Sequence, residues 1–315
     1  MASNLRVLFI GSKKLGLAAL RVLYKAVSGD LLGVLTVDDR SDTRSAFDEI
    51  REFSVQRGIP FHVAGNRKSA AETIRLLNPD LCLVVGWYWL IDNATLAVAK
   101  RGFIGLHNSL LPAYRGGSPL VWSIMNGDKR VGATLFSFTE GMDDGDVWGY
   151  ADIKVGPDDT IGEVLERLET KCVKWLNKIL PAILDGTVKP RPQLSKFSSY
   201  CAQRLPSDGE VDWTRPANAV YDAIRAQGRP YPGAFTRWNG KKLIIWRAGR
   251  FDFRYFGVPG QVARVSQEGV LVICGDRRAV VLKQIEYDQR ICNAQDVLTS
   301  VKIRLASEAR ARSES

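Results

Sequence analysis

Short runs of β-forming apolar residues alternate with helix-like segments along the first 107 residues. Gly11 and Ser12 separate the first run from a helical pattern, and Leu81–Val85 is almost continuously apolar, as expected of a strand buried on both faces. The predicted strands are Leu5–Ile10, Leu31–Val37, Phe61–Ala64, Leu81–Val85 and Phe103–Leu106, with helices predicted over Ala46–Arg57 and Ala70–Leu77. This alternation predicts an α/β fold with an open, mainly parallel, Rossmann-like sheet.

The pattern of the sequence changes at Lys189–Ser199, a stretch rich in Pro and Ser. Before this stretch, Ala133–Phe138 predicts one more strand, and Thr160–Leu184 predicts a long amphipathic helix. Beyond the stretch, short strands separated by turn residues are predicted over Ala234–Trp238, Leu243–Ala248, Gly260–Val265, Gly269–Cys274 and Val280–Ile285. Such strands are typical of a small β-barrel-like domain of the OB type. We therefore predict a first domain over 1–188, a linker over 189–204, a second domain over 205–306 and a tail over 307–315.

The chain is basic, with 44 Lys and Arg against 34 Asp and Glu and a net charge of +10 over 315 residues. Residues 201–315 hold 19 of these basic and 12 of these acidic residues, so +7 of the surplus lies there. A basic surplus suggests an anionic partner, which a nucleic acid or a phosphorylated small molecule would equally satisfy.

The sequence favours a cytoplasmic protein. It contains no run of 18 apolar residues that could span a membrane, and its start, MASNLRVLFIGS, lacks the features of a secretory signal. The cysteines are odd in number and form no CxxC pair, so we expect neither a disulfide framework nor a metal site. They are Cys82, Cys172, Cys201, Cys274 and Cys292.

Two polar segments that follow predicted strands are candidates for chemistry. His107, one of two histidines, follows Phe103–Leu106, and the acidic loop Glu140–Asp146 follows Ala133–Phe138. A lone histidine is more often structural and an acidic turn more often a solvated loop. In open α/β sheets, however, ligands bind at the carboxyl ends of strands. If the two strand ends are neighbours, a carboxylate of this loop can pair with His107 and orient its ring.

Motifs for nucleotide phosphates and calcium are incomplete. The segment GSKKLG after the first strand lacks the middle glycine of the dinucleotide fingerprint and the Lys-Ser pair of a P-loop. The acidic loop lacks the twelve-residue ligand pattern of a calcium loop.

The segments HNSLLPAYRGGSPLVW and NGDKRVGATLFSFTEGMDDGDV resemble the core of the 10-formyltetrahydrofolate-dependent formyltransferases. The pattern of that family is Asn-x-His, then SLLP, Arg-Gly and later Asp-x-Gly. Asp143 lies 36 residues after His107, and this spacing makes it the counterpart of the family's aspartate. The segment DGEVDWTRPANAVYDAIRA is similar to the C-terminal domain of the methionyl-tRNA and sugar-type members.

The resemblance implies roles for individual residues. His107 would donate a hydrogen bond to the tetrahedral oxyanion of formyl transfer, Asp143 would hold His107 and help remove the amine proton, and Asn108 is a third catalytic candidate. The co-substrate would be 10-formyltetrahydrofolate, with no metal. Residues implied to bind the folate are Trp89, Leu90, Ile91, Leu111, Pro112, Thr139, Glu140, Gly141 and Met142.

The chain departs from the family pattern next to His107. The family's Asn, which donates to the oxyanion, is Gly105 here, and the loss of one such donor typically costs about 100- to 1000-fold in rate. Asn108 could substitute, although in an extended segment a neighbour of His107 points to the opposite face. A second departure is Gly117, where some sugar-type members carry an Arg.

Three functions follow from these observations. The first is transfer of a formyl group to a primary amine of a small molecule, most simply an amino sugar attached to a nucleotide. The second is formylation of methionyl-tRNA, which suits the basic surplus; against it, Asp38–Ser45 is mixed in charge where the tRNA enzymes carry a longer basic loop. The third is a non-catalytic folate- or nucleotide-binding homologue, suggested by Gly105 alone. A homodimer is an open alternative to a monomer.

Overall fold

The computed structural model describes residues 5–305, so the predicted tail lies outside the described residues. The chain divides into two compact units, which are described separately. The first comprises residues 1–119, 131–153 and 166–202, and the second comprises residues 120–130, 154–165 and 203–315. The exact domain boundaries stay a prediction. None of the helices within residues 5–305 has the length and apolar character to cross a membrane.

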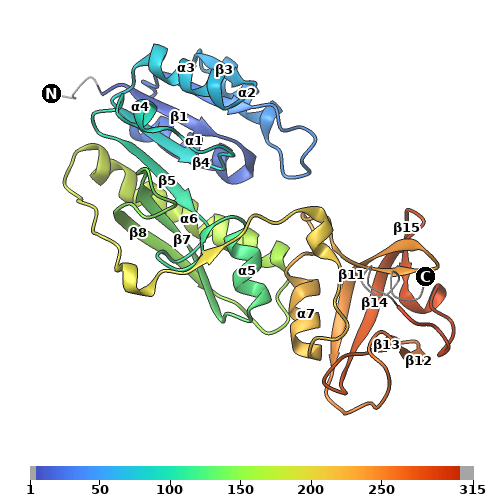
Figure 1. Ribbon diagram of the computed structural model, residues 1–315. Coiled ribbons are helices and arrows are strands. Elements are labelled where there is room, and N and C mark those ends of the chain that lie inside the picture. Colours follow the sequence, from blue (N-terminus) through green and yellow to red (C-terminus); the bar gives the residue numbers. More distant parts are fainter. Residues whose placement is uncertain (1–4, 306–315) are drawn as a thin grey trace. The chain divides into compact units, whose positions relative to one another are not determined.

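A seven-stranded sheet forms the first unit, in the order β3-β2-β1-β4-β5-β7-β8 (Figure 1). Strands β1 to β5 pair in parallel, and β7 pairs antiparallel with β5. The mainly parallel α/β sheet is therefore confirmed. The strands are β1 (Val7–Gly11), β2 (Gly33–Val37), β3 (Phe61–Ala64), β4 (Leu81–Val85), β5 (Phe103–His107), β7 (Arg130–Ser137) and β8 (Val147–Lys154).

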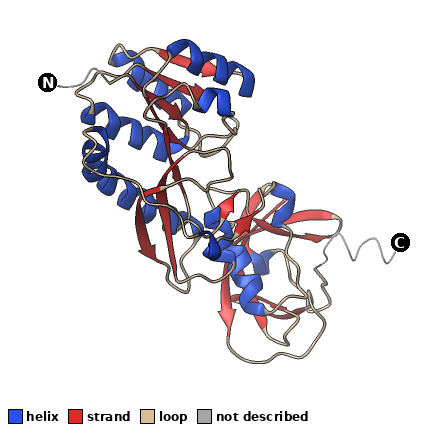
Figure 2. Ribbon diagram, turned by 60° about the vertical axis from the view of Figure 1, so that its left-hand side comes forward, coloured by secondary structure: helices blue, strands red, loops and turns tan. Residues whose placement is uncertain are grey.

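Helices lie on both faces of this sheet (Figure 2). Helix α3 begins where the Asn66 side chain accepts a hydrogen bond from the Ser69 N–H and ends at Asn78, which has a left-handed backbone. Its Ile74 packs on the same core cluster as Leu8 and Val84. The helices of the chain before residue 190 are α1 (Lys13–Ala26), α2 (Phe47–Gln56), α3 (Arg67–Leu77), α4 (Asn93–Leu96), α5 (Pro119–Met125) and α6 (Ile161–Leu184).

Three strands carry little sequence signal. Strand β8 buries only two of its eight residues, Val147 and Ala151, so apolar residues mark it poorly. Strands β6 (Arg115–Gly116) and β9 (Tyr200–Cys201) contain two residues each and pair in parallel, across 85 positions of sequence. Pairing at this range is set by tertiary structure, which local propensity does not report.

The second unit contains a six-stranded antiparallel sheet in the order β10-β11-β14-β13-β12, with β15 paired to β14. An antiparallel β domain after the α/β domain is therefore confirmed. Helix α7 (Ala217–Arg225) packs Val220 and Ile224 into the same core as Leu243 and Ile285. The strands are β10 (Ala234–Trp238), β11 (Lys241–Phe251), β12 (Val262–Ser266), β13 (Gly269–Ile273), β14 (Ala279–Tyr287) and β15 (Arg290–Asn293).

Paired charges occupy the carboxyl ends of β1 and β2. The Lys13 Nζ lies 2.8 Å from Asp39 Oδ2 and 2.7 Å from Asp42 Oδ2, and the Tyr88 hydroxyl donates to Asp39 at 2.9 Å. Arg44 also pairs with Asp42 at 2.8 Å. Burial raises the pKa of both carboxyls, but hydrogen bonds outweigh it and hold each pKa below the ordinary 3.8. Lys13 and the hydroxyls of Ser45 and Tyr88 donate to Asp39, and Arg44 and Lys13 donate to Asp42.

This cluster predicts a pH-dependent contribution to stability. Because Asp39 and Asp42 titrate at lower pH in the folded chain, their stabilisation is present above pH 3.8 and is lost as the pH falls through the folded pKa. We expect Lys13→Met to lower the free energy of unfolding by about 3 kcal/mol near neutral pH and by less in acid, measured by urea denaturation. The exposed neighbour Lys14→Met is the control. A loss that does not change with pH would contradict this assignment.

Candidate functional site

The site lies where β5 ends, but the condition stated for the pairing of His107, that the two strand ends are neighbours, is not met. His107 is the last residue of β5 and pairs with Thr134, whereas Ser137, at the end of β7, pairs with Ile104 near the start of β5. Because β7 runs antiparallel to β5, the acidic loop begins at the far end of the strand from His107. The loop nevertheless returns, and Asp143 Oδ2 lies 3.6 Å from His107 Nδ1.

The imidazole of His107 is held in one orientation. Its Nε2 lies 2.8 Å from the carbonyl oxygen of Tyr114, and only 10% of the side chain is exposed. A carbonyl can only accept, so Nε2 carries the hydrogen of this bond. Nδ1 therefore faces the Asp143 carboxylate, at a distance too long for a hydrogen bond. Nδ1 thus lies near the carboxylate but forms no hydrogen bond with it.

Asp143 is fixed by its backbone surroundings. It has a left-handed conformation with φ of +50°, and its Oδ2 accepts a hydrogen bond of 2.8 Å from the Gly116 N–H. The Gln193 side chain donates to the carbonyls of Asp143 and Gly145, both at 2.8 Å. Among residues 5–305, no donor reaches Oδ1, and 23% of the side chain is exposed. This oxygen is therefore available to a ligand.

The segment predicted as a linker contributes to this site. Gln193 accepts hydrogen bonds from buried Arg115 at 2.7 and 3.2 Å, and β9 pairs with the strand that contains Arg115 and Gly116. The Cys201 thiol lies 3.4 Å from the Arg115 carbonyl. Burial, followed by the nearby Asp143 carboxylate, raises the pKa of this thiol to about 11. Residues 193–201 therefore form part of the wall behind Asp143.

Gly105 faces an aromatic ring. A Cβ atom added at Gly105 would lie 2.0 Å from Cε1 of Phe138, which is far inside van der Waals contact. The Phe138 ring stacks on Phe136 with centroids 5.1 Å apart, and Phe136 meets the edge of His107 at 6.2 Å. The position from which the family's Asn would project is therefore filled by the Phe138 ring.

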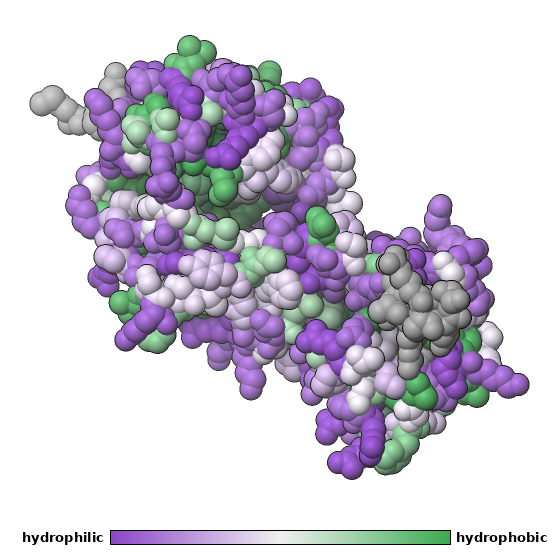
Figure 3. All heavy atoms as spheres, viewed as in Figure 1, coloured by the Kyte–Doolittle hydropathy of each residue, from purple (hydrophilic) through white to green (hydrophobic). Residues whose placement is uncertain are grey.

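The residues predicted to bind folate fall into three groups. In the segment after β4, Trp89 packs edge-on against Trp87 at 5.2 Å, and Ile91 packs on the same core cluster, whereas Leu90 is exposed. Leu111 is buried with Phe136, and Pro112 follows it. The third group is the exposed loop before Asp143, which comprises Thr139, Glu140, Gly141 and Met142. Figure 3 shows hydrophobic atoms in a hollow of the first unit with hydrophilic residues around it.

Asn108 is less well placed than His107 and Asp143. Its side chain is half-buried and makes no hydrogen bond to any of residues 5–305. Its catalytic role stays a prediction, as do the roles of the folate-binding candidates.

Sequence reasoning missed the groups that hold Asp143. The Gly116 N–H is a backbone donor and leaves no side-chain signal, although the Arg115-Gly116 pair belongs to the motif. Gln193 follows Pro190 and Pro192 in a segment without periodicity, so only its side-chain contacts reveal it. Phe138 was assigned to the end of a strand, and its contact with Gly105 appears only when β5 and β7 pair.

Comparisons with known proteins agree with this architecture. Residues 17–180 match the family model described as formyl transferase, and residues 205–302 match its C-terminal domain. A methionyl-tRNA formyltransferase of Myxococcus xanthus is 30% identical over 97% of this chain and 98% of its own. The bifunctional polymyxin resistance protein ArnA of Wigglesworthia glossinidia brevipalpis is 30% identical over 92% of this chain, which spans only 44% of that protein.

A solved structure shares the fold at lower identity. The N-formyltransferase of Helicobacter canadensis, in complex with folinic acid and dTDP-3-aminofucose, superposes with a TM-score of 0.68 and 14% identity over 88% of this chain and 98% of its own. Both domains of the chain match one family, and the relative from Myxococcus xanthus matches over nearly its whole length. The chain belongs to the formyl transferase family.

Proposed function

We propose that this protein transfers the formyl group of 10-formyltetrahydrofolate to the primary amine of a small molecule, an amino sugar attached to a nucleotide. The observation that carries the proposal is the approach of His107 Nδ1 and Asp143 Oδ2 to 3.6 Å at the end of β5. Membership in the family supplies the class of reaction, and the complex of the Helicobacter canadensis relative supports the donor and the acceptor class.

The geometry suits acyl transfer between two nitrogens. The acceptor amine attacks the formyl carbon, and the carbonyl oxygen becomes an oxyanion. The imidazolium form of His107, which keeps Nε2–H on the Tyr114 carbonyl and also carries a hydrogen on Nδ1, stabilises this oxyanion by a hydrogen bond from Nδ1. The unoccupied Asp143 Oδ1 accepts the proton that the amine loses. The intermediate then collapses: the bond from the formyl carbon to folate N10 breaks, the carbonyl forms again, and N10 takes up the proton from Asp143, which returns to a carboxylate. Gly105 has no side chain and therefore donates no side-chain hydrogen bond to the oxyanion.

The charges at the carboxyl ends of β1 and β2 favour a small acceptor. Arg40 pairs with Asp38, Arg44 with Asp42, and Lys13 with both Asp39 and Asp42. Each of these three cations is thus paired with a neighbouring carboxylate, which weakens its attraction for the backbone of a nucleic acid.

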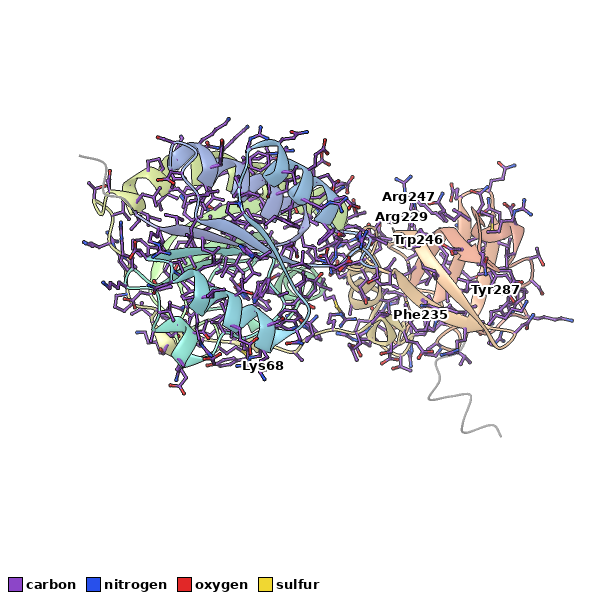
Figure 4. All side chains as sticks on the ribbon, turned by 90° about the horizontal axis from the view of Figure 1, so that it is seen from above. Lys68, Arg229, Phe235, Trp246, Arg247 and Tyr287 are labelled. Atoms are coloured by element: carbon purple, nitrogen blue, oxygen red, sulfur yellow. The ribbon has the colours of Figure 1, made fainter. Side chains whose placement is uncertain are left out.

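The surface of the C-terminal unit favours a second candidate for the formyl acceptor, methionyl-tRNA. The guanidinium of Arg229 lies 4.8 Å from the Trp246 ring, and Lys242 lies 4.1 Å from that of Phe235 (Figure 4). Arg247 is exposed beside Trp246 and has no ion pair within the described residues. Exposed cations suit phosphates, and the half-buried Trp246 ring suits a stacked base, whereas Phe235 is buried.

The catalytic pair gives the first prediction of this proposal. We expect His107→Ala and Asp143→Asn each to lower kcat for formyl transfer by about 100-fold or more, because one removes the oxyanion donor and the other the proton acceptor. His62→Ala, which changes the other histidine of the chain, is the matched control. Full activity of His107→Ala, measured with saturating donor, would refute the mechanism.

Gln193, which holds the acidic loop by two hydrogen bonds, gives the second prediction. Gln193→Ala removes both hydrogen bonds that hold the Asp143 and Gly145 carbonyls. We expect kcat to fall by about 10-fold, since displacement of a reacting group by a fraction of an ångström is costly. Gln56→Ala, on the exposed face of α2, is the control. Unchanged kcat would show that the loop holds its position without Gln193.

The acceptor is tested by direct competition of substrate classes. Radiolabelled formyl groups should appear on a nucleotide-linked amino sugar and not on methionyl initiator tRNA, and tRNA should not bind at low salt. Formylation of methionyl-tRNA, with affinity that falls steeply as salt rises, would instead establish the second candidate.

The third hypothesis, that the chain is a non-catalytic folate- or nucleotide-binding homologue, is tested at Gly105. The variant must carry two changes, Gly105→Asn and Phe138→Ala, because the Phe138 ring leaves no room for a side chain at residue 105. We expect the wild type to be the more active of the two. Activity in the double variant alone would indicate a degenerate site.

A further inference from the structure

We propose that Phe138 is a positioning residue for His107, and that Gly105 is small so that the Phe138 ring can take this place. The inference rests on the proposed function, because it assigns a role toward the histidine of that reaction. It concerns a row of three rings on one face of the β5–β7 ladder: His107, Phe136 and Phe138.

The backbone does not require glycine at residue 105. Gly105 lies inside β5, in register with Val84 on one side and Phe136 on the other, and its φ lies outside the left-handed region. The requirement comes from space alone, since an added Cβ would lie 2.0 and 2.8 Å from two atoms of the Phe138 ring. Glycine and the ring are therefore a matched pair.

The ring connects two parts of the core to the site. Phe138 packs against the cluster that contains Phe103 and Val84, and also against the separate cluster of Leu111, Phe136 and Val147. Its own N–H donates to the Phe103 carbonyl at 2.8 Å, which fixes the residue beside β5. The ring is thus anchored by groups other than His107 and Asp143.

The stack transmits this position to the imidazole. Phe138 and Phe136 lie 5.1 Å apart with their planes inclined by 27°, and Phe136 meets His107 edge-on at 79°. The Nε2–H of the same imidazole donates a hydrogen bond to the Tyr114 carbonyl. The imidazole is therefore held between an aromatic support and a hydrogen bond, with Nδ1 left toward Asp143.

The scarcity of histidine makes this orientation measurable. The chain contains only His62 and His107, so the imidazole nitrogen NMR spectrum contains two ring systems, which His62→Gln assigns. In the wild type we expect neutral His107 to carry its hydrogen on Nε2 alone. This readout needs neither a formyl donor nor an acceptor.

Four variants test the coupling. Phe138→Ala removes the ring, Gly105→Ala displaces it, and Phe138→Leu retains apolar volume in case the first variant is poorly folded. We expect the first two to lose the single Nε2–H tautomer and to lower kcat by about 10- to 100-fold, with a smaller change in KM for the donor. Phe138→Leu should retain more of both. The double variant Gly105→Ala/Phe138→Ala should lie within about threefold of Phe138→Ala, since both changes act on one ring.

The control is Phe253→Ala, which removes an exposed ring of the C-terminal unit. Unchanged His107 signals in both Phe138→Ala and Gly105→Ala would overturn the inference, as would fully additive losses in the double variant. A wild type without transfer activity would overturn the proposed function instead, and the NMR signals would still decide whether Phe138 orients His107.

Discussion

The antiparallel pairing of β7 with β5 separates the acidic loop from His107. It places the start of the acidic loop at the opposite end of β5 from His107. A loop that left β7 freely would carry its carboxylates into solvent. Two contacts reverse it: the Gly116 N–H binds the Asp143 side chain, and Gln193 binds the backbone of Asp143 and Gly145. The His107–Asp143 pair is a product of these contacts.

The same pairing explains why the first unit needs the segment after α6. Gln193 lies in a part of the chain that looks like a connection between domains, yet it is held by buried Arg115 and in turn holds the loop. The strand pair β6–β9 fixes the register of this segment against Gly116. The two reacting side chains and the side chain that holds their loop therefore come from three stretches of sequence that are distant from one another.

The sequence predicts most of the fold and the identity of the central pair. Strands such as Leu81–Val85 are strongly apolar, and local patterns locate them without tertiary information. His107 and Asp143 are found by motif and spacing. The anchors are not, because a backbone N–H has no residue type and Gln193 has no periodic context. The relation of Gly105 to Phe138 is a contact across two strands, so the departure from the family pattern was visible in the sequence whereas the ring that fills the space was not.

A crystal structure of the protein with a stable folate analogue that carries its formyl group on N10 tests this arrangement most directly. In this arrangement, the folded-back loop and His107 together enclose the reacting carbon. We expect the formyl group to lie between His107 Nδ1 and Asp143 Oδ1, with its oxygen within hydrogen-bond distance of Nδ1 and the Gly116 and Gln193 contacts intact. A folate whose formyl group lies away from both side chains would contradict it.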